Sequence, residues 1–166
     1  MIYRAYLFDW GNTLMKDYPF YRGPMKAWPK VAAVPGAQKA LEHLSARAQC
    51  HLITNALDSE EDDIWEALGR VNLDNYINKI FCYKNIGFKK PSRKFYLKVI
   101  SLLGVDPKKI AVVGDSFEND ILGAVNNGIF GYWYNPFSSE NKDDKMYSTI
   151  HTLEELIPIT DQSSLG

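Results

Sequence analysis

Short apolar segments alternate with amphipathic helical segments along most of this chain. The apolar segments are brief and rich in β-branched or aromatic residues, as expected for strands that are buried on both faces of a sheet. There are five of them, at residues 3–8, 50–53, 79–82, 110–113 and 130–134. Strands that alternate with helices are typical of βαβ crossovers. The sequence therefore predicts a doubly wound α/β fold, Rossmann-like or flavodoxin-like, with three αβα layers and the first strand central in a parallel sheet of about five strands.

The size of the chain favours a single domain, and its charge bears on possible partners. With 166 residues, of which 46% are hydrophobic, the chain has enough apolar material for one sizeable core. We expect one domain over residues 1–160, with a loop insertion at about 15–34, and a flexible tail at 161–166. The formal net charge of -1 gives no overall attraction to nucleic acid, so no nucleic-acid partner is expected.

The sequence offers little to suggest a membrane or an oxidising compartment. No apolar run approaches the ~20 residues that span a bilayer, and the N-terminus lacks a cationic segment followed by a long apolar one. We therefore expect no membrane partner and a cytoplasmic location. Cys50 and Cys82 lack the paired spacing of a disulfide scaffold or a zinc site, so both are expected to lie in the core as small hydrophobes.

Carboxylates follow two of the predicted strands. Asp9 comes directly after the first strand, and Asp115 follows the fourth. Because the carboxyl ends of parallel strands meet near a topological switch point, the two side chains are expected to converge on one ion. Mg²⁺, bound by one or two carboxylates beside a phosphate, fits such a site best. The two strand ends therefore predict a metal site that serves phosphate chemistry.

Four short segments, in this order along the chain, resemble the motifs of the haloacid dehalogenase-like hydrolase superfamily. They are Asp9 to Thr13, Thr54-Asn55, Lys90-Pro91 and Gly114 to Asp120. Any one of these motifs is weak, but four in the right order are specific, and the likeness spans nearly the whole chain. Most members of the superfamily are Mg²⁺-dependent phosphatases that act through an aspartyl-phosphate. The resemblance therefore implies a phosphoric monoester hydrolase.

The resemblance also implies roles for the strand-end carboxylates. Asp9 is the expected nucleophile, which takes up the phosphoryl group before water releases it. Mg²⁺ is expected to be held by Asp9, by the backbone carbonyl of Gly11 and by Asp115. The metal reduces the repulsion between the Asp9 carboxylate and the anionic phosphate. Asp120 is expected to support the metal site, directly or through a water molecule.

The remaining motif residues are expected to bind the phosphoryl group or to support the site. The Thr54 hydroxyl, the Asn55 backbone N–H and the Lys90 ammonium would supply donors and positive charge to the phosphoryl oxygens, and Thr54 and Lys90 are counted as catalytic. Trp10 and Gly11 are expected to contribute to the substrate site. The residues expected to support the site are Asn12, Thr13, Ser116 and Asp120.

Gly11 departs from the phosphatase pattern. In that branch of the superfamily, the residue two positions after the nucleophile is usually an aspartate, which protonates the leaving alcohol and later activates water. Such acid and base catalysis contributes ~10²–10⁴ in rate. Here the position carries no side chain. The alternative to a phosphatase is therefore a catalytically weak or inactive module that binds Mg²⁺ and a phosphorylated ligand for regulation or scaffolding.

The segments between the motifs are short, so the sequence predicts no separate cap domain. The one long irregular connection, at about 15–34, contains Tyr18, Phe20, Tyr21 and Trp28. These aromatic residues are candidates for a wall that selects the substrate, for a homo-oligomer contact, or simply for packing the loop onto the domain. The expected substrate is a phosphorylated small molecule or macromolecule. Dehalogenase chemistry fits less well, because it needs a closed apolar pocket made by a cap.

Overall fold

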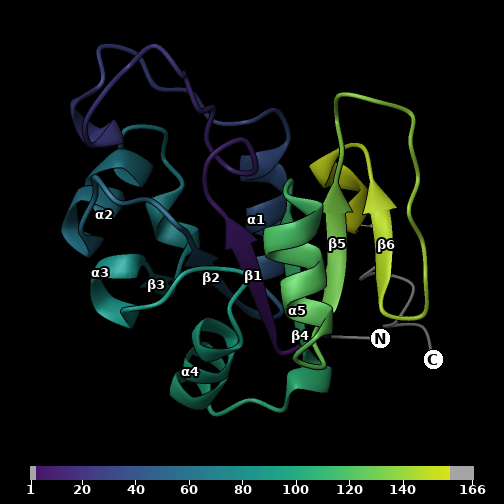
Figure 1. The fold of residues 1–166 in the computed structure, drawn as a ribbon. Helices are drawn as coiled ribbons and strands as arrows, with labels where there is room; N and C mark the ends of the chain where they lie inside the picture. Colours follow the sequence, from purple (N-terminus) through teal and green to yellow (C-terminus); the bar gives the residue numbers. More distant parts are fainter. Residues whose placement is uncertain (1–2, 158–166) are drawn as a thin grey trace.

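A six-stranded parallel sheet lies at the centre of the computed structural model, which describes residues 3–157 (Figure 1). Its strands are β1 (Ala5–Asp9), β2 (Gln49–Ile53), β3 (Lys79–Phe81), β4 (Ile110–Gly114), β5 (Phe130–Tyr134) and β6 (Tyr147–Ile150). They are arranged in the order β3-β2-β1-β4-β5-β6, and every neighbouring pair is parallel. β1 is therefore central, and the order is that of a Rossmann sheet. The predicted fold class is confirmed.

The sheet has one strand more than the five that the sequence predicts. β6 pairs with β5 in parallel along its whole length and forms the edge of the sheet. Three of its four residues are only partly buried, and two of them, Ser148 and Thr149, are polar. The segment therefore lacks the continuous apolar run that identifies the strands buried on both faces.

Helices cover both faces of the sheet, as Figure 1 shows. They are α1 (Ala37–Ser45), α2 (Glu61–Gly69), α3 (Tyr83–Ile86), α4 (Arg93–Leu103) and α5 (Gly123–Val125), and a π-helical turn, Phe117–Leu122, precedes α5. Successive residues of β1 belong to opposite faces. Tyr6 and Phe8 pack in the core that includes α1 and α2, whereas Leu7 packs in the core that includes α4 and α5. This alternation produces the predicted αβα layers.

Local sequence signals fix both ends of α4. Ser92 is the N-cap residue, and its hydroxyl accepts a hydrogen bond from the Phe95 backbone N–H at 3.2 Å. Gly104 ends the helix with a φ of 63°, a left-handed conformation that suits glycine. Because Lys90 comes just before this cap, the start of α4 helps to fix the position of the lysine backbone.

The long connection between β1 and α1 is held against the domain by a hydrogen bond and by aromatic packing. The Arg70 guanidinium, at the end of α2, donates to the Trp28 carbonyl at 2.7 Å. The rings of Tyr18, Tyr21 and Trp28 contact one another and pack against the core. Phe20, by contrast, is 71% exposed. Three of the four aromatic residues therefore pack the loop onto the domain, which was one of the three expected roles. The homo-oligomer contact stays a prediction.

Residues 3–157 contain no cap domain separate from this sheet and its helices. The tail predicted at 161–166 lies outside the described residues. Cys50 and Cys82 are both buried and unpaired, in agreement with the sequence. Within the described part of the chain, no helix has the length and apolar character to cross a membrane.

Candidate active site

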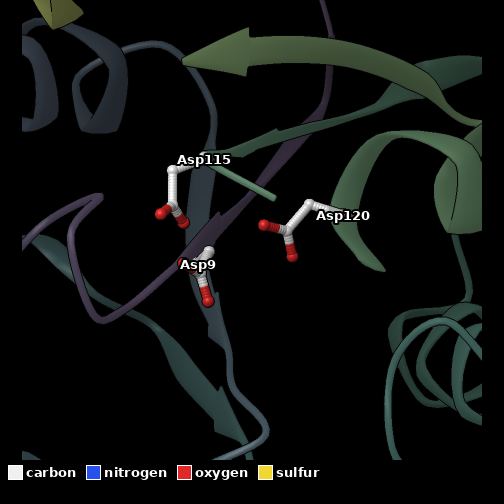
Figure 2. Close-up of side chains that lie close together, drawn as sticks. All are labelled: Asp9, Asp115 and Asp120. Atoms are coloured by element: carbon white, nitrogen blue, oxygen red, sulfur yellow. The ribbon is translucent and has the colours of Figure 1, made fainter. Parts of the chain in front are cut away.

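Three aspartates converge at the carboxyl ends of β1 and β4 (Figure 2). Asp9 is the last residue of β1, Asp115 directly follows β4, and Asp120 lies in the π-helical turn that comes next. One carboxylate oxygen from each residue lies within 4.8 Å of those from the other two. The parallel strands thus bring together residues that are far apart in the sequence, as their positions at strand ends predicted.

Lys90 supplies a buried positive charge to this cluster. Its ammonium lies 2.8 Å from Asp9 Oδ1 and 2.6 Å from Asp120 Oδ1, and it donates to the Ile53 carbonyl at 3.2 Å. The lysine side chain is only 3% exposed. Burial disfavours its charge, but the carboxylates of Asp120 and Asp9 outweigh burial and raise the pKa of the ammonium above its ordinary value. Lys90 is therefore a fixed cation that links β1, β2 and the turn after β4.

The aspartates carry more negative charge than Lys90 offsets. Burial raises the pKa of Asp115 to about 7, and the neighbouring Asp9 adds to the shift. Burial also raises the pKa of Asp120, although Lys90 opposes this change. Crowding of carboxylates in a partly buried site disfavours their charged forms. A divalent cation that prefers oxygen ligands would relieve this repulsion, so the donor set of Asp9, Asp115 and Asp120 fits Mg²⁺.

Both oxygens of Asp9 are oriented by neighbouring side chains. Oδ1 faces Lys90, and Oδ2 accepts a hydrogen bond from the Thr13 hydroxyl at 3.0 Å. The hydroxyl of Thr13, which is fully buried, also lies 3.3 Å from Asp115 Oδ1. Since a hydroxyl has a single hydrogen, it can donate to only one of the two carboxylates at a time. Thr13 therefore helps to hold Asp9 and Asp115 close together.

The turn after β4 holds Asp120 against the cluster. The Ser116 backbone N–H donates to Asp120 Oδ2 at 3.1 Å, and the Ser116 hydroxyl accepts from the Asn119 N–H at 3.2 Å. A β-carbon at Gly114 would overlap the Asp120 carboxylate, so a glycine is needed there to leave room for it. Ser116 thus orients Asp120, and its predicted support of a catalytic site stays a prediction.

Two aromatic residues that were not predicted to belong to the site also support it. The Trp133 indole N–H, from β5, donates to the Asp115 carbonyl at 3.0 Å. The Tyr96 hydroxyl, from α4, donates to the Asn119 carbonyl at 2.7 Å and so braces the turn that carries Asp120. Both contacts join elements that are separate in the sequence. The only sequence signal was an aromatic residue with a polar group in a buried segment, which is too common to be diagnostic.

Asn55 connects the end of β2 to the segment that carries Lys90. Its amide nitrogen donates to the Lys90 carbonyl at 2.9 Å, and its amide oxygen accepts from the Lys90 backbone N–H at 2.8 Å. Thr54 is 4% exposed, and its hydroxyl accepts from the Ala56 N–H at 3.1 Å. The Asn55 side chain is therefore structural, and the binding of phosphoryl oxygens by Thr54 and by the Asn55 N–H stays a prediction.

A cavity of about 310 Å³ adjoins Asp9. The chain after β1, the end of β2 and the long loop form most of its walls. The lining residues besides Asp9 are Trp10, Gly11, Asp17, Gly23, Met25, Trp28, Thr54, Asn55 and residues 56–59. Trp10 is only 3% exposed, and its indole N–H donates to the Met15 sulfur at 3.1 Å. The long loop thus forms one wall of the space in front of the predicted nucleophile.

Asp17 also lines this cavity, although sequence reasoning did not select it. Its backbone N–H donates to the side-chain oxygen of Asn12 at 3.0 Å, and Asn12 has a φ of 60°. Asn12 therefore shapes the turn after β1, whereas its predicted support of the catalytic residues is indirect. An acidic residue in an irregular loop has no periodicity that could reveal where its side chain lies.

Comparison with known proteins gives relatives and a shared fold. The chain is 28% identical over 129 residues to the pyrimidine 5′-nucleotidase YjjG of Escherichia coli, a match covering 75% of this chain and 56% of that protein. It is 27% identical over 135 residues to a glyceraldehyde 3-phosphate phosphatase of Pyrococcus furiosus, covering 79% and 55%. The chain thus spans little more than half the length of these relatives.

A solved structure shares nearly the whole fold. The crystal structure of an uncharacterized protein from Listeria monocytogenes serotype 4b superposes with a TM-score of 0.81 and 20% identity, covering 98% of this chain and 99% of the other. The sequence profile of the haloacid dehalogenase-like hydrolases matches residues 5–133, a stretch that contains all four motifs and every residue of the aspartate and lysine cluster. This chain belongs to the haloacid dehalogenase-like hydrolase family.

Proposed function

We propose that this protein is a Mg²⁺-dependent phosphatase that hydrolyses a phosphate monoester through an aspartyl-phosphate on Asp9. The observation that carries the proposal is the placement of the Asp9 carboxylate, which is oriented by Lys90 and Thr13 and adjoins a cavity. Two relatives named as a nucleotidase and a phosphatase support the reaction class.

Asp9 would attack phosphorus and displace the alcohol, and water would then release phosphate from the phosphorylated aspartate. Lys90 and Thr13 hold the two carboxylate oxygens in place, so little conformational freedom is lost when the reaction begins. Asp9, the Gly11 carbonyl and Asp115 would hold Mg²⁺, and Asp120 would support the metal site directly or through a water molecule. When bound, the metal would supply positive charge that lessens the repulsion between the carboxylate and the phosphoryl group.

Donors near Asp9 would receive the phosphoryl oxygens. Lys90 brings a permanent charge, and Thr54 and Asn55 line the same cavity. The loop from Gly23 to Trp28 limits the access of water from one side, which strengthens these electrostatic contacts. A volume of about 310 Å³ suits a phosphoryl group with a small organic part, so we favour a phosphorylated small molecule over a macromolecule.

The test is Mg²⁺-dependent release of phosphate from an aryl phosphate, whose leaving group needs little protonation. We expect turnover by the native protein that requires Mg²⁺ and is lost in Asp9→Asn, which keeps the size of the side chain. Lys89→Met serves as a control, since this lysine is exposed and adjacent to Lys90. If the native protein shows no turnover but still binds Mg²⁺ and beryllofluoride, the binding-module alternative replaces the phosphatase.

A further inference from the structure

The Asp17 side chain borders the space that a side chain at Gly11 would occupy. A β-carbon added to Gly11 would lie 3.5 Å from Asp17 Cβ and 3.7 Å from Asp17 Oδ2. Both residues line the cavity that adjoins Asp9. In the phosphatase pattern, an acid at the position of Gly11 would act from this space. The Asp17 carboxylate, from the long loop, reaches the same space.

The backbone of Asp17 is held in place, whereas its carboxylate is free to react. The Asp17 N–H donates to the Asn12 side chain at 3.0 Å, and the Lys16 N–H donates to the Ala32 carbonyl at 2.9 Å. The Asp17 side chain is exposed, and within residues 3–157 its carboxylate has neither a hydrogen-bond partner nor an ion-pair partner. The structure therefore gives this carboxylate no role in stabilising the fold.

Asp17 also stands between two cavities. Besides the space next to Asp9, it lines a second, more apolar cavity of about 650 Å³, whose walls include Tyr18, Tyr134 and Phe137. An ester with its phosphoryl group in the first cavity and an organic part that extends towards the second would carry its bridging oxygen past Asp17. An acid at this point would meet the leaving group.

From this placement we propose that Asp17 is the catalytic acid and base that Gly11 lacks, an inference that rests on the proposed phosphatase function. In the first step, an Asp9 oxygen bonds to phosphorus, the bond from phosphorus to the ester oxygen breaks, and that oxygen takes a proton from Asp17. In the second step, water attacks phosphorus and gives a proton to Asp17. The bond from phosphorus to Asp9 then breaks, which restores both carboxyl groups and releases phosphate.

The test compares two esters that differ in their need for protonation. Native protein, Asp17→Asn and Asp9→Asn are assayed with Mg²⁺ on para-nitrophenyl phosphate and on an alkyl phosphate such as glycerol phosphate. We expect Asp17→Asn to lower kcat/KM for the alkyl ester by ~10²-fold or more, and for the aryl ester by much less. With the aryl ester, whose first step needs little acid, the phosphorylated enzyme should also accumulate in Asp17→Asn, because its hydrolysis loses the base.

Matched variants separate this role from a general loss of charge. Asp58→Asn removes an exposed carboxylate from another wall of the same cavity and should affect both esters equally. Gly11→Asp added to Asp17→Asn should restore alkyl phosphate turnover, since the new β-carbon has room. Equal activity of native protein and Asp17→Asn on the alkyl ester, or an equal loss on both esters, would overturn the role of Asp17 while Asp9-dependent turnover still supports the phosphatase. Absence of turnover by the native protein would overturn both.

Discussion

Replacing Lys90 with methionine tests the electrostatic design of the site. Lys90 Nζ contacts Asp9 and Asp120 at 2.8 and 2.6 Å, and Asp120 is only 1% exposed. Methionine keeps most of the length of the side chain but removes the charge. Removing one partner of a buried ion pair costs ~3–5 kcal/mol of unfolding free energy. We expect about 3 kcal/mol near pH 8, the lower end of that range, because Asp120 can take up a proton and so escape the full penalty.

The pH dependence of this loss follows from the pKa of Asp120. Burial raises that pKa even with Lys90 present, and without the lysine it must rise further. Folded Lys90→Met then binds a proton that the unfolded chain has lost above its ordinary pKa of ~4. The stability of the variant therefore falls as pH rises from about 4 through the folded-state pKa, by up to ~1.4 kcal/mol per pH unit. Its deficit relative to the native protein should be small at pH 5 and large at pH 8.

The assay is urea unfolding followed by tryptophan fluorescence at several pH values. Lys89→Met is the matched control, because Lys89 is exposed and lies 5.6 Å from the centre of the Tyr83 ring. Such an exposed contact contributes ~0.5–1 kcal/mol at most. If Lys90→Met and Lys89→Met lower the unfolding free energy equally at pH 8, the buried contacts of Lys90 with Asp9 and Asp120 do not stabilise the fold as their geometry indicates.

Three further experiments test the room at Gly114, the metal site and the buried His51. Gly114→Ala should lower both activity and stability, because its β-carbon would overlap the Asp120 carboxylate. Gly69→Ala is the control: its β-carbon would have only ordinary contacts, so it should be close to neutral in the same assays. Mg²⁺ at ~100 times its Kd should raise the unfolding free energy by ~2.7 kcal/mol. Asp115→Asn should reduce this gain, measured by thermal unfolding. An unchanged gain in the variant would argue against a metal held by Asp115. Burial, with a smaller contribution from Lys79, lowers the pKa of His51 to about 4, so protonation of the unfolded chain should reduce stability as pH falls from ~6.5 towards 4. His51→Leu should lessen that slope, and equal slopes in urea titrations would refute the burial of a neutral imidazole.

The strand ends could be predicted because parallel strands impose their own geometry. Strands that are buried on both faces have distinctive apolar runs, and the carboxyl ends of such strands share one edge of the sheet. Asp9 and Asp115 are therefore found together as expected. The inclusion of Lys90 and Asp120 in the site followed from the resemblance, since no spacing rule joins a residue before α4 to the turn after β4. Contacts across the fold are not encoded in local periodicity.

The features that escaped prediction have physical reasons. β6 is an edge strand with polar residues at Ser148 and Thr149, so it lacks the pattern of a buried strand. Asp17 lies in an irregular loop, and its place beside Gly11 depends on the turn formed by Asn12. Trp133 acts through one indole hydrogen bond to a backbone carbonyl. Each depends on tertiary contacts rather than on local residue preferences.

Trapping a covalent intermediate on Asp9 tests the proposed mechanism without relying on turnover rates. Native protein is mixed with Mg²⁺ and radiolabelled para-nitrophenyl phosphate, whose leaving group needs little protonation. The mixture is quenched in acid and digested, and the labelled peptide is identified. We expect label on the peptide that contains Asp9, its loss in Asp9→Asn, and a larger labelled fraction in Asp17→Asn. Turnover without any labelled protein, together with full activity in Asp9→Asn, would contradict it.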